Sequence, residues 1–494
     1  MKHNVLRILF AAAEAAPFVK VGGLGDVVGS LPPALLDLSP SLKGTQLDIR
    51  VAIPFHAVIP RQVAPSQPEV TFSISTPAGP KQAHAYRADL RGIPVYFIDG
   101  DPIPREGGVY SLDTQKDGEK FTFFSLACLE LCRALQWKPD ILHAHDWHAA
   151  LAIHQLAELR EHDPFFRSTR GVLTVHNLPY MGAGTDQAMR AYGIKPRLDP
   201  RLPPWGSYQP LPMGLAAADH ITTVSPTYSR EILTPEFGCG LETFLQSRAS
   251  SLTGILNGLD MKEWDPATDH LIKAPFNRDD LAPREENRKA LLEEVGLDPW
   301  SDAPLLILVS RFDRQKGIDL VSDALRQVQS EPWQAIFLGS GDPLLEESAR
   351  RLELDLPSRV RAVLRFDSQL SRRMFAGGDV LLMPSRYEPC GLTQMIAMRY
   401  GCLPVAHATG GLRDTIIDLG EPSRSSGFLF ETASASALAA TLRRAFAAYA
   451  NRPSWVARQR FAMSQDFSWS RSAQAYLDLY FALTDSTQNQ GDIE

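Results

Sequence analysis

A glycine-rich segment directly follows the first apolar run of the chain. It reads KVGGLGDV (residues 20–27), so a lysine stands two residues before a pair of glycines. Such a segment could bind a dinucleotide, hold a phosphate in another kind of loop, or form an ordinary turn. Gly23, Gly25 and Gly29 have the spacing GxGxxxG rather than GxGxxG, and the next expected strand does not end in an acidic residue. We therefore favour a loop in which backbone N–H groups and Lys20 bind an anion.

A second basic loop occurs in the other half of the chain. The segment VSRFDRQKG (309–317) follows an apolar run and contains Arg311 and Lys316. A planar guanidinium and a compact ammonium on one turn suit a diphosphate, although an isolated Arg/Lys pair is more often a solvated surface loop. Because this pair comes directly after an expected buried strand, we interpret it as a second phosphate-binding element.

The segment PSRYEPCGLTQ (384–394) also joins an expected strand to an expected helix. It contains Glu388, and its residues 391–393 are expected to form the N-terminus of the helix. The N–H groups at a helix N-terminus lack partners within the helix and can bind phosphate groups and sugar hydroxyls. The segment is therefore a candidate for binding both phosphate and sugar.

Histidines cluster at the ends of two expected strands in the first half. The segments are HAHDWHA (143–149) and TVHN (174–177), and a set of this kind could bind a metal ion. However, a strand end and the following helix start do not easily direct so many side chains at one ion, and basic residues can neutralise a diphosphate. We therefore expect no metal and no other cofactor. We expect Asp146 to cap a helix or to accept from a sugar hydroxyl, and His176 to lie in the binding cleft.

Apolar runs alternate with helical patterns along most of the chain. The runs are continuously apolar, as in strands that are buried on both faces of a parallel sheet. The expected strands are 5–12, 48–54, 94–98, 140–143, 172–176, 220–224, 304–310, 333–338, 361–364, 379–383 and 403–406. We predict an α/β protein with two doubly wound, Rossmann-like domains, 1–257 and 258–475. Residues 476–494 are expected to be the end of a helix, returning to the first domain, and a polar tail, 485–494.

Ligands of such sheets bind at the carboxyl ends of the strands, so we expect a site in the cleft between the two domains. The composition limits the class of protein further. The 494 residues are 44% hydrophobic and 22% charged, which suits two or three soluble domains. The net charge of −7 argues against nucleic acid or an anionic membrane as the main partner. The five cysteines form no CxxC motif, and no apolar run has the length of a membrane span, so we expect a cytoplasmic protein.

The motifs together resemble those of the bacterial glycogen synthases and plant starch synthases. The resemblance extends from residue 5 to about residue 482, and the motifs occur in the order found in that family. They are KVGGLGDV, HAHDWHA, TVHN, VSPTYSREI (224–232), ILNGLD (255–260), SRFDRQKG, LGSGDP (338–343), PSRYEPCGLTQ and TGGLRDT (409–415). The resemblance implies a retaining glucosyltransferase of the glycosyltransferase-B fold, in which two Rossmann-like domains face a deep cleft. It also implies ADP-glucose as the donor and the non-reducing end of an α-1,4-glucan, glycogen, as the acceptor.

The resemblance also implies roles for the residues that match the family's motifs. The expected catalytic residues are Glu388, near the glucosyl group, His176, facing the glucose, and Arg311 and Lys316, which stabilise the leaving phosphate. The expected substrate-binding residues are Lys20, Gly23, Tyr110, Asp146, Asn257, Phe366, Cys390, Gly391, Leu392 and Thr393. Among these, Phe366 falls where the family places an aromatic ring against the base.

The chain departs from the pattern of the wider fold class at three places. Many retaining enzymes with this fold carry Glu-x7-Glu, but the second position here is Ile396, as is common in the synthase branch. Arg365 and Phe366 replace an expected Gly-Tyr pair, which leaves the choice between ADP-glucose and UDP-glucose open. Phe312 and Arg314 also differ from the expected leucine and small polar residue, a change that we expect to be tolerated.

Three alternatives stay open at the level of sequence. The first is another retaining glucosyltransferase, with a UDP-glucose donor or a different acceptor. The second is a nucleotide-sugar or glucan-binding protein without turnover, although binding alone would not need Lys20, Arg311, Lys316 and Glu388 together. The third is an NAD-dependent oxidoreductase, which the missing acidic residue after the second strand disfavours.

Overall fold

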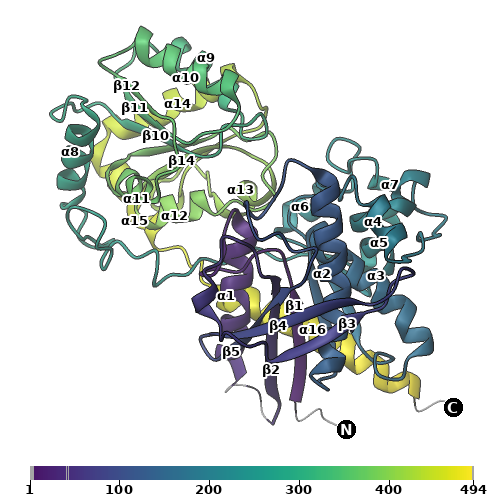
Figure 1. Ribbon diagram of the computed structural model, residues 1–494. Helices are drawn as coiled ribbons and strands as arrows, with labels where there is room; N and C mark the ends of the chain where they lie inside the picture. The colour runs from purple at the N-terminus through teal and green to yellow at the C-terminus, as the bar shows by residue number, and fades with distance from the viewer. Residues whose placement is uncertain (1–4, 40–41, 43, 492–494) are drawn as a thin grey trace. The chain divides into compact units, whose positions relative to one another are not determined.

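Figure 1 shows the computed structural model, which describes residues 5–39, 42 and 44–491. The chain divides into two compact units. The first contains the chain up to Gly258 together with the segment that begins at Trp469, whereas the second is Leu259–Ser468. Residues 469–475, which we expected in the second domain, therefore lie in the first unit. Among the residues that the structure describes, every helix is too short or too polar to span a bilayer.

The first unit is built on a nine-stranded sheet with the order β3-β4-β5-β2-β1-β6-β7-β8-β9. Its strands are β1 (Val5–Ala11), β2 (Gln46–Pro54), β3 (Val70–Ile74), β4 (Lys81–Leu90), β5 (Ile93–Asp99), β6 (Ile141–His145), β7 (Arg170–Val175), β8 (His220–Thr223) and β9 (Leu252–Gly254). Neighbouring strands are parallel except where β4 pairs with β3 and with β5. The strand order reverses between β1 and β6, and doubly wound sheets bind ligands at the carboxyl ends of strands at such a reversal. The glycine-rich loop follows β1, and Asp146 follows β6.

Eight α-helices of the described residues belong to the first unit. They are α1 (Gly23–Leu38), α2 (Thr114–Ala134), α3 (Asp146–His162), α4 (Asp186–Ala191), α5 (Pro210–Ala217), α6 (Pro226–Glu231), α7 (Glu242–Ser247) and α16 (Trp469–Gly491). The last of them, α16, packs against α1. Its Tyr480 is fully buried and hydrogen-bonds through its hydroxyl to His143 Nδ1 at 2.7 Å. Helix α16 is therefore part of the core of the first unit, and it includes residues 485–491, which we expected in a polar tail; residues 492–494 lie outside the described residues.

The second unit contains a six-stranded, fully parallel sheet with the order β12-β11-β10-β13-β14-β15. Its strands are β10 (Leu305–Val309), β11 (Gln334–Leu338), β12 (Val360–Val363), β13 (Val380–Met383), β14 (Leu403–His407) and β15 (Phe428–Phe430). Its α-helices are α8 (Arg284–Val295), α9 (Ile318–Gln327), α10 (Pro343–Asp355), α11 (Ser368–Gly377), α12 (Thr393–Arg399), α13 (Gly410–Thr415), α14 (Ala435–Ala450) and α15 (Arg452–Met463). Here the order reverses between β10 and β13. Arg311 and Lys316 follow β10, and Glu388 follows β13.

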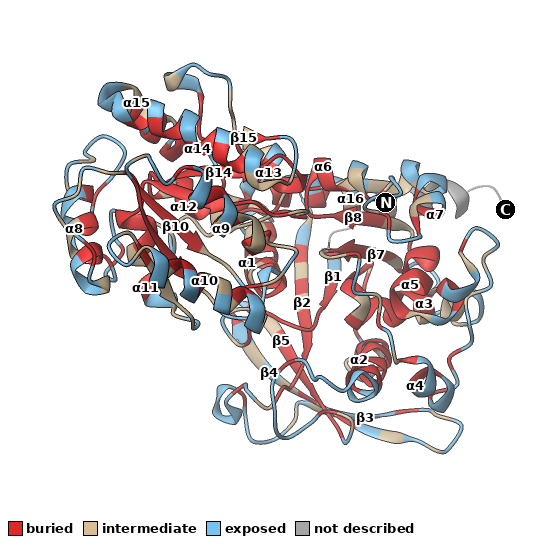
Figure 2. Cartoon of the chain, turned by 90° about the horizontal axis from the view of Figure 1, so that it is seen from above, coloured by how far each residue is buried: buried red, intermediate tan, exposed pale blue. Residues whose placement is uncertain are grey.

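Local sequence explains where these elements form. The central strands β1, β10 and β14 are buried along most of their length (Figure 2), as their continuous apolar runs predict. Several helices begin at an aspartate or serine whose side chain accepts from first-turn N–H groups, for example Asp113 before α2, Asp342 before α10 and Ser434 before α14. These residues satisfy donors that have no partner within the helix.

The antiparallel edge formed by β3 and β4 was absent from the sequence prediction. In β4 the buried residues Ala83 and Ala85 alternate with more exposed polar residues, and β3 shows the same alternation. A strand with only one covered face has no continuous apolar run, and alanine contributes little to an apolar pattern. The prediction of a parallel α/β protein holds for the strands that position the candidate site.

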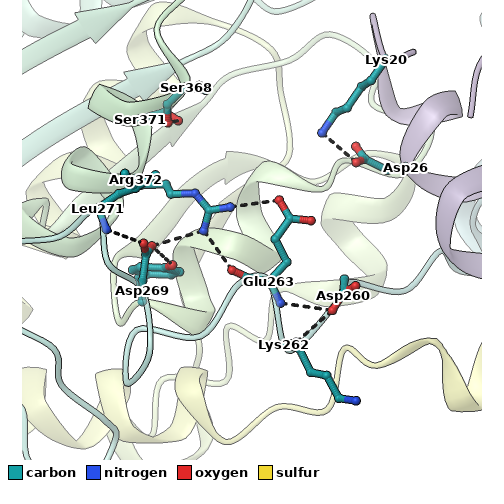
Figure 3. A network of polar contacts seen from close by, with 11 residues as sticks. Lys20, Asp26, Asp260, Lys262, Glu263, Asp269, Leu271, Ser368, Ser371 and Arg372 are labelled. Carbon is teal, nitrogen blue, oxygen red and sulfur yellow. Dashed lines mark hydrogen bonds and ion pairs between the residues drawn. The ribbon is translucent and has the colours of Figure 1, made fainter. Parts of the chain in front are cut away.

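A polar network holds the first segment of the second unit against two of its helices (Figure 3). Arg372 of α11 donates to the Glu263 carboxylate at 2.9 Å and to Asp269 Oδ2 at 3.2 Å. Tyr400, at the C-terminus of α12, donates from its hydroxyl to the same Asp269 oxygen at 2.5 Å. The segment 260–271 is thereby tied to α12, the helix that begins at Thr393.

Candidate active site

The glycine-rich loop joins β1 to α1, and Gly22 is the N-cap residue of this helix. The helix begins at Gly23, so Asp26 belongs to its first turn. Lys20 is about half exposed, and its ammonium forms an ion pair with Asp26 Oδ1 at 2.7 Å (Figure 3). Burial raises the pKa of Asp26 above its ordinary value, and the nearby Lys20 opposes that shift. An anion at this helix N-terminus would compete with Asp26 for the lysine.

A buried carboxylate that the sequence analysis did not select supports this loop. Glu14 is 2% exposed, and its Oε2 accepts from the backbone N–H groups of Val21 at 2.6 Å and Gly22 at 3.0 Å. Its Oε1 accepts from the hydroxyl of Tyr110. The sequence analysis expected the N–H groups of this loop to bind an anion. For Val21 and Gly22 that anion is the carboxylate of Glu14. Glu14 lies in the apolar run just after the strand expected at 5–12, and a carboxylate in such a run requires partners, which was the available indication.

The polar cluster at the ends of β6 and β7 brings Asp146 and His176 together. Asp146 Oδ1 accepts from the backbone N–H of His176 at 2.7 Å and, more weakly, of Asn177 at 3.4 Å. The ring of His176 is hydrogen-bonded through Nε2 to His145 Nδ1 at 2.9 Å. Burial lowers the pKa of His176 to about 3, so the imidazole is neutral at physiological pH. Within the described residues, no group of His, Cys, Asp and Glu side chains has a metal-binding arrangement.

Asp146→Asn is expected to reduce the pH dependence of the free energy of unfolding. Burial raises the pKa of Asp146 from 3.8 to about 7, so between these values the folded state holds a proton that the unfolded state has released. The free energy of unfolding should therefore fall as pH rises through this range, by at most about 1.4 kcal/mol per pH unit. Asparagine tolerates the φ of 55° found here and can accept from the same N–H groups. Urea denaturation at several pH values measures the slope.

The exposed carboxylate of Asp186 provides the control for that experiment. Its side chain is 52% exposed in the same unit, so Asp186→Asn should leave the slope unchanged. An identical slope for Asp146→Asn and the wild-type protein would contradict the assignment of the raised pKa to Asp146.

Asn257 lies after β9 and is only 5% exposed. Its amide oxygen Oδ1 is buried and has no partner among the described protein atoms. Asn177 Oδ1 and His145 Nε2 in the same unit are likewise buried and unpaired within the described part of the chain. Buried polar atoms are normally hydrogen-bonded, so these three atoms are candidates for binding a ligand hydroxyl or a water molecule.

In the second unit the structure brings Lys316 and Glu388 together. Lys316 Nζ donates to Glu388 Oε2 at 2.6 Å, and the hydroxyl of Ser385 donates to the same oxygen at 3.0 Å. The side chains of Lys316 and Glu388 are 20% and 7% exposed. The pair lies where the strand order reverses between β10 and β13. A buried carboxylate beside an ammonium is an arrangement that can stabilise charge on both a sugar and its leaving group.

Glycines allow the loop after β13 to pack closely against its neighbours. A Cβ atom on Gly317 would lie 2.1 Å from Pro384 O, and one on Gly411 would lie 1.9 Å from Cys390 O. The backbone N–H of Gly411 donates to Glu388 O at 3.0 Å. The amide of Gln394 donates to Cys390 O at 3.0 Å and to Gly391 O at 2.8 Å. The backbone around Glu388 is thus fixed from two sides.

The remaining predicted residues of the second unit differ in exposure. Arg311 has a side chain that is 62% exposed and lies 3.4 Å from Asp313 Oδ2. Phe366 is 87% exposed in the segment between β12 and α11, whereas Cys390 is 5% exposed. Leu392 is the N-cap residue of α12, and within the described residues no side chain caps this helix. An exposed aromatic ring and an exposed guanidinium at the carboxyl ends of strands are available to a ligand.

The chain is similar to known proteins along almost its whole length. Residues 7–247 match the family model described as starch synthase catalytic domain, and residues 296–460 match that of glycosyl transferases group 1. The glycogen synthase of Anaeromyxobacter dehalogenans (strain 2CP-C) is 40% identical over 493 residues, covering 97% of this chain and 100% of that protein. The glycogen synthase of Streptococcus sanguinis (strain SK36) is 38% identical over 489 residues, with the same coverage.

A solved structure shows the same similarity in three dimensions. The catalytic domain of starch synthase IV from Arabidopsis thaliana, bound to ADP and acarbose, superimposes with a TM-score of 0.86 at 33% identity. The match covers 97% of this chain and 99% of that one. The likeness therefore extends over both α/β units.

Proposed function

Because the chain belongs to the glycogen and starch synthase family of glycosyltransferases, with the glycosyltransferase-B fold, we propose that it elongates an α-1,4-glucan with glucose from ADP-glucose. The anomeric configuration is retained in this reaction. The observation that carries the proposal is the ion pair of Lys316 with the buried Glu388 at the strand-order reversal of the second unit, in a chain similar to glycogen synthases over its full length. The acceptor is the non-reducing end of glycogen, and the proposed location is the cytoplasm.

The leaving group of this reaction is a nucleotide diphosphate, on which negative charge develops as the bond to the sugar breaks. Arg311 and Lys316 supply positive charge to it from the second unit, and Lys20 with the first turn of α1 at Gly23 supplies it from the first. Lys316 is already paired with Glu388, so binding of the diphosphate shares the ammonium between the two anions. The backbone of Gly391, Leu392 and Thr393 binds phosphate and sugar hydroxyls.

The sugar itself develops positive charge at its anomeric carbon. Glu388, fixed by Lys316 and Ser385, stabilises that charge, and the neutral His176 with Asp146 binds glucose hydroxyls. The acceptor 4-hydroxyl attacks from the side of the leaving group. The bond between the anomeric carbon and the phosphate oxygen breaks, the new bond to the acceptor oxygen forms, and the departing phosphate oxygen takes the hydroxyl proton.

Four further residues complete the proposed binding site. Tyr110 and Cys390 lie beside the donor, the unpaired amide oxygen of Asn257 accepts from a sugar hydroxyl, and the exposed ring of Phe366 packs against the base. The preference for ADP-glucose over UDP-glucose depends on this last contact and on its neighbour Arg365, which forms an ion pair with Asp367 at 2.9 Å.

The test is incorporation of radiolabelled glucose from ADP-glucose into glycogen, with UDP-glucose, EDTA and a Lys20→Ala variant in parallel. We expect incorporation from ADP-glucose that is unaffected by EDTA. In the variant, incorporation should fall at least about 100-fold, because the positive charge of Lys20, which stabilises the leaving group, is lost. Release of the label by β-amylase would establish the α-1,4 linkage and hence retention. Preference for UDP-glucose would direct attention to Arg365 and Phe366. No incorporation from either donor by folded protein would refute the proposal.

A further inference from the structure

A chain of polar contacts runs through the first unit and ends at the glycine-rich loop. We propose that Glu14 is a positioning residue for the nucleotide-sugar donor, and that Tyr110 acts through it rather than only as a donor contact. The inference rests on the proposed function, because it assumes that this loop binds the diphosphate of the donor. It assigns roles to two buried groups, Glu14 and the Asp117–Lys120 pair, that the proposed reaction does not otherwise use.

We call this chain of contacts the relay: it runs from the Asp117–Lys120 ion pair through Tyr110 to Glu14 and the glycine-rich loop. It begins at that buried ion pair, in the first turns of α2. Lys120 and Asp117 are 2% and 6% exposed, and Lys120 Nζ lies 2.6 Å from Asp117 Oδ1. Lys120 Nζ also donates to Val109 O at 2.7 Å, and the backbone N–H of Ser111 donates to Asp117 Oδ2 at 2.9 Å. One ion pair therefore holds the peptide groups on both sides of Tyr110. Removing two charges from water costs free energy, which their mutual attraction and their hydrogen bonds must offset. We infer that this ion pair serves to position Tyr110.

The segment that carries Tyr110 is also anchored at its other end. Asp99, the last residue of β5, is 1% exposed and forms ion pairs with Arg105 at 2.8 Å and with Arg61 at 3.1 Å. Arg105 belongs to the connection between β5 and α2, and so does Tyr110. A connection of this length would otherwise have considerable conformational freedom. With both ends held, the hydroxyl of Tyr110 is directed at Glu14.

Glu14 transmits this position to the glycine-rich loop. Its Oε1 accepts from Tyr110, while its Oε2 accepts from the N–H groups of Val21 and Gly22. The preceding residue is fixed as well, because His56 Nε2 hydrogen-bonds to Ala13 O at 2.8 Å. Gly25 leaves room for the carboxylate, since a Cβ atom there would lie 3.1 Å from Glu14 Oε2. The loop between Lys20 and the start of α1 is therefore held by one carboxylate.

An ordered glycine-rich loop should bind the nucleotide-sugar donor more tightly than a flexible one. The two N–H groups that Glu14 binds come directly after Lys20 and directly before the first turn of α1. A loop that is already ordered loses less conformational freedom when the diphosphate binds, so its affinity for the donor is higher. Loss of the relay should therefore weaken donor binding while leaving the chemistry of the bound complex and the acceptor affinity nearly unchanged.

The test is a double-mutant cycle with Tyr110→Phe and Glu14→Gln, read out as KM for ADP-glucose, KM for glycogen and kcat. Tyr110→Phe keeps the ring, which lies 5.2 Å from the ring of His148, and deletes only the hydroxyl. We expect each variant to raise KM for ADP-glucose about tenfold, as for loss of a hydrogen bond to a charged group, with kcat changed less than about threefold. In the double variant the effects should not multiply, because both substitutions break the same relay.

Hydrogen exchange of the peptide covering residues 15–26 gives a readout that needs no turnover. Exchange should be faster in both variants, whereas Tyr208→Phe, at a tyrosine that is 53% exposed, should match the wild-type protein in exchange and kinetics. Multiplying effects on KM, or unchanged exchange in Tyr110→Phe, would overturn the relay. If the wild-type protein did not use ADP-glucose, the proposed function would fail, and the exchange rates would still decide whether Tyr110 and Glu14 order the loop.

Discussion

Lys316→Ala is expected to lower kcat for glucose transfer by about 10³-fold, as for the removal of a group that stabilises charge in the transition state. Lys316 Nζ is 2.6 Å from the buried Glu388 carboxylate and is, in the proposed reaction, one of the two cations that face the leaving phosphate in the second unit. KM for glycogen should change little, because the lysine does not bind the acceptor. Initial rates at saturating ADP-glucose measure the loss.

Among the residues that the structure describes, the same substitution leaves the buried Glu388 carboxylate with the Ser385 hydroxyl as its remaining hydrogen-bond donor. An unpaired buried charge destabilises the fold, so lower activity could arise from unfolding alone. Adding Glu388→Gln to Lys316→Ala removes that charge and should restore the melting temperature without restoring kcat. Lys262→Ala, at an exposed lysine of the same unit, is the matched control and should behave as the wild-type protein. A kcat for Lys316→Ala within about threefold of the wild-type value would contradict the role in transition-state stabilisation.

The strands that position the site could be predicted because they are buried on both faces. Strands such as β10 and β13 appear in the sequence as continuous apolar runs, and their order follows the usual doubly wound pattern. The strands β3 and β4 could not be predicted in this way, because each has one covered face, and in β4 the buried side chains include small ones such as Ala83. The boundary at Trp469 was also missed, since an amphipathic helix does not reveal which domain covers its apolar face.

Some residues of the candidate site could likewise be predicted from the sequence, and others could not. Lys316 and Glu388 are 72 residues apart, yet both follow strands that become neighbours at the reversal, so their meeting follows from the fold class. The position of Glu14 in an apolar run indicates that it has partners, but the sequence does not identify them, because they are backbone N–H groups and one tyrosine hydroxyl 96 residues away. Backbone donors leave no pattern of side-chain types, and only the three-dimensional structure assigns them to a particular carboxylate.

Gly411→Ala is expected to reduce kcat/KM for ADP-glucose by about 10²-fold or more, since a misplacement of about 1 Å in a catalytic group can cost that much. A Cβ atom on Gly411 would lie 1.9 Å from Cys390 O and 2.5 Å from Cys390 C, so the start of α13 and the loop after β13 must move apart. The hydrogen bond from the Gly411 N–H to Glu388 O would be strained by this movement. Steady-state kinetics with ADP-glucose, together with thermal unfolding, measure the effect on the site and on the fold.

Gly420→Ala separates this clash from a general intolerance of alanine at glycine positions. Gly420 has a φ of 78°, but a Cβ atom there would meet nothing within 4 Å. Alanine at Gly420 should therefore cost about 1 kcal/mol of stability through its left-handed conformation and leave kcat/KM unchanged. Gly411 does not have a positive φ, so alanine is not strained by the backbone conformation there. A loss of activity in Gly411→Ala would therefore arise from displacement of the backbone that holds Glu388. If Gly411→Ala kept full activity, the close packing of α13 on this loop would have no part in positioning the carboxylate.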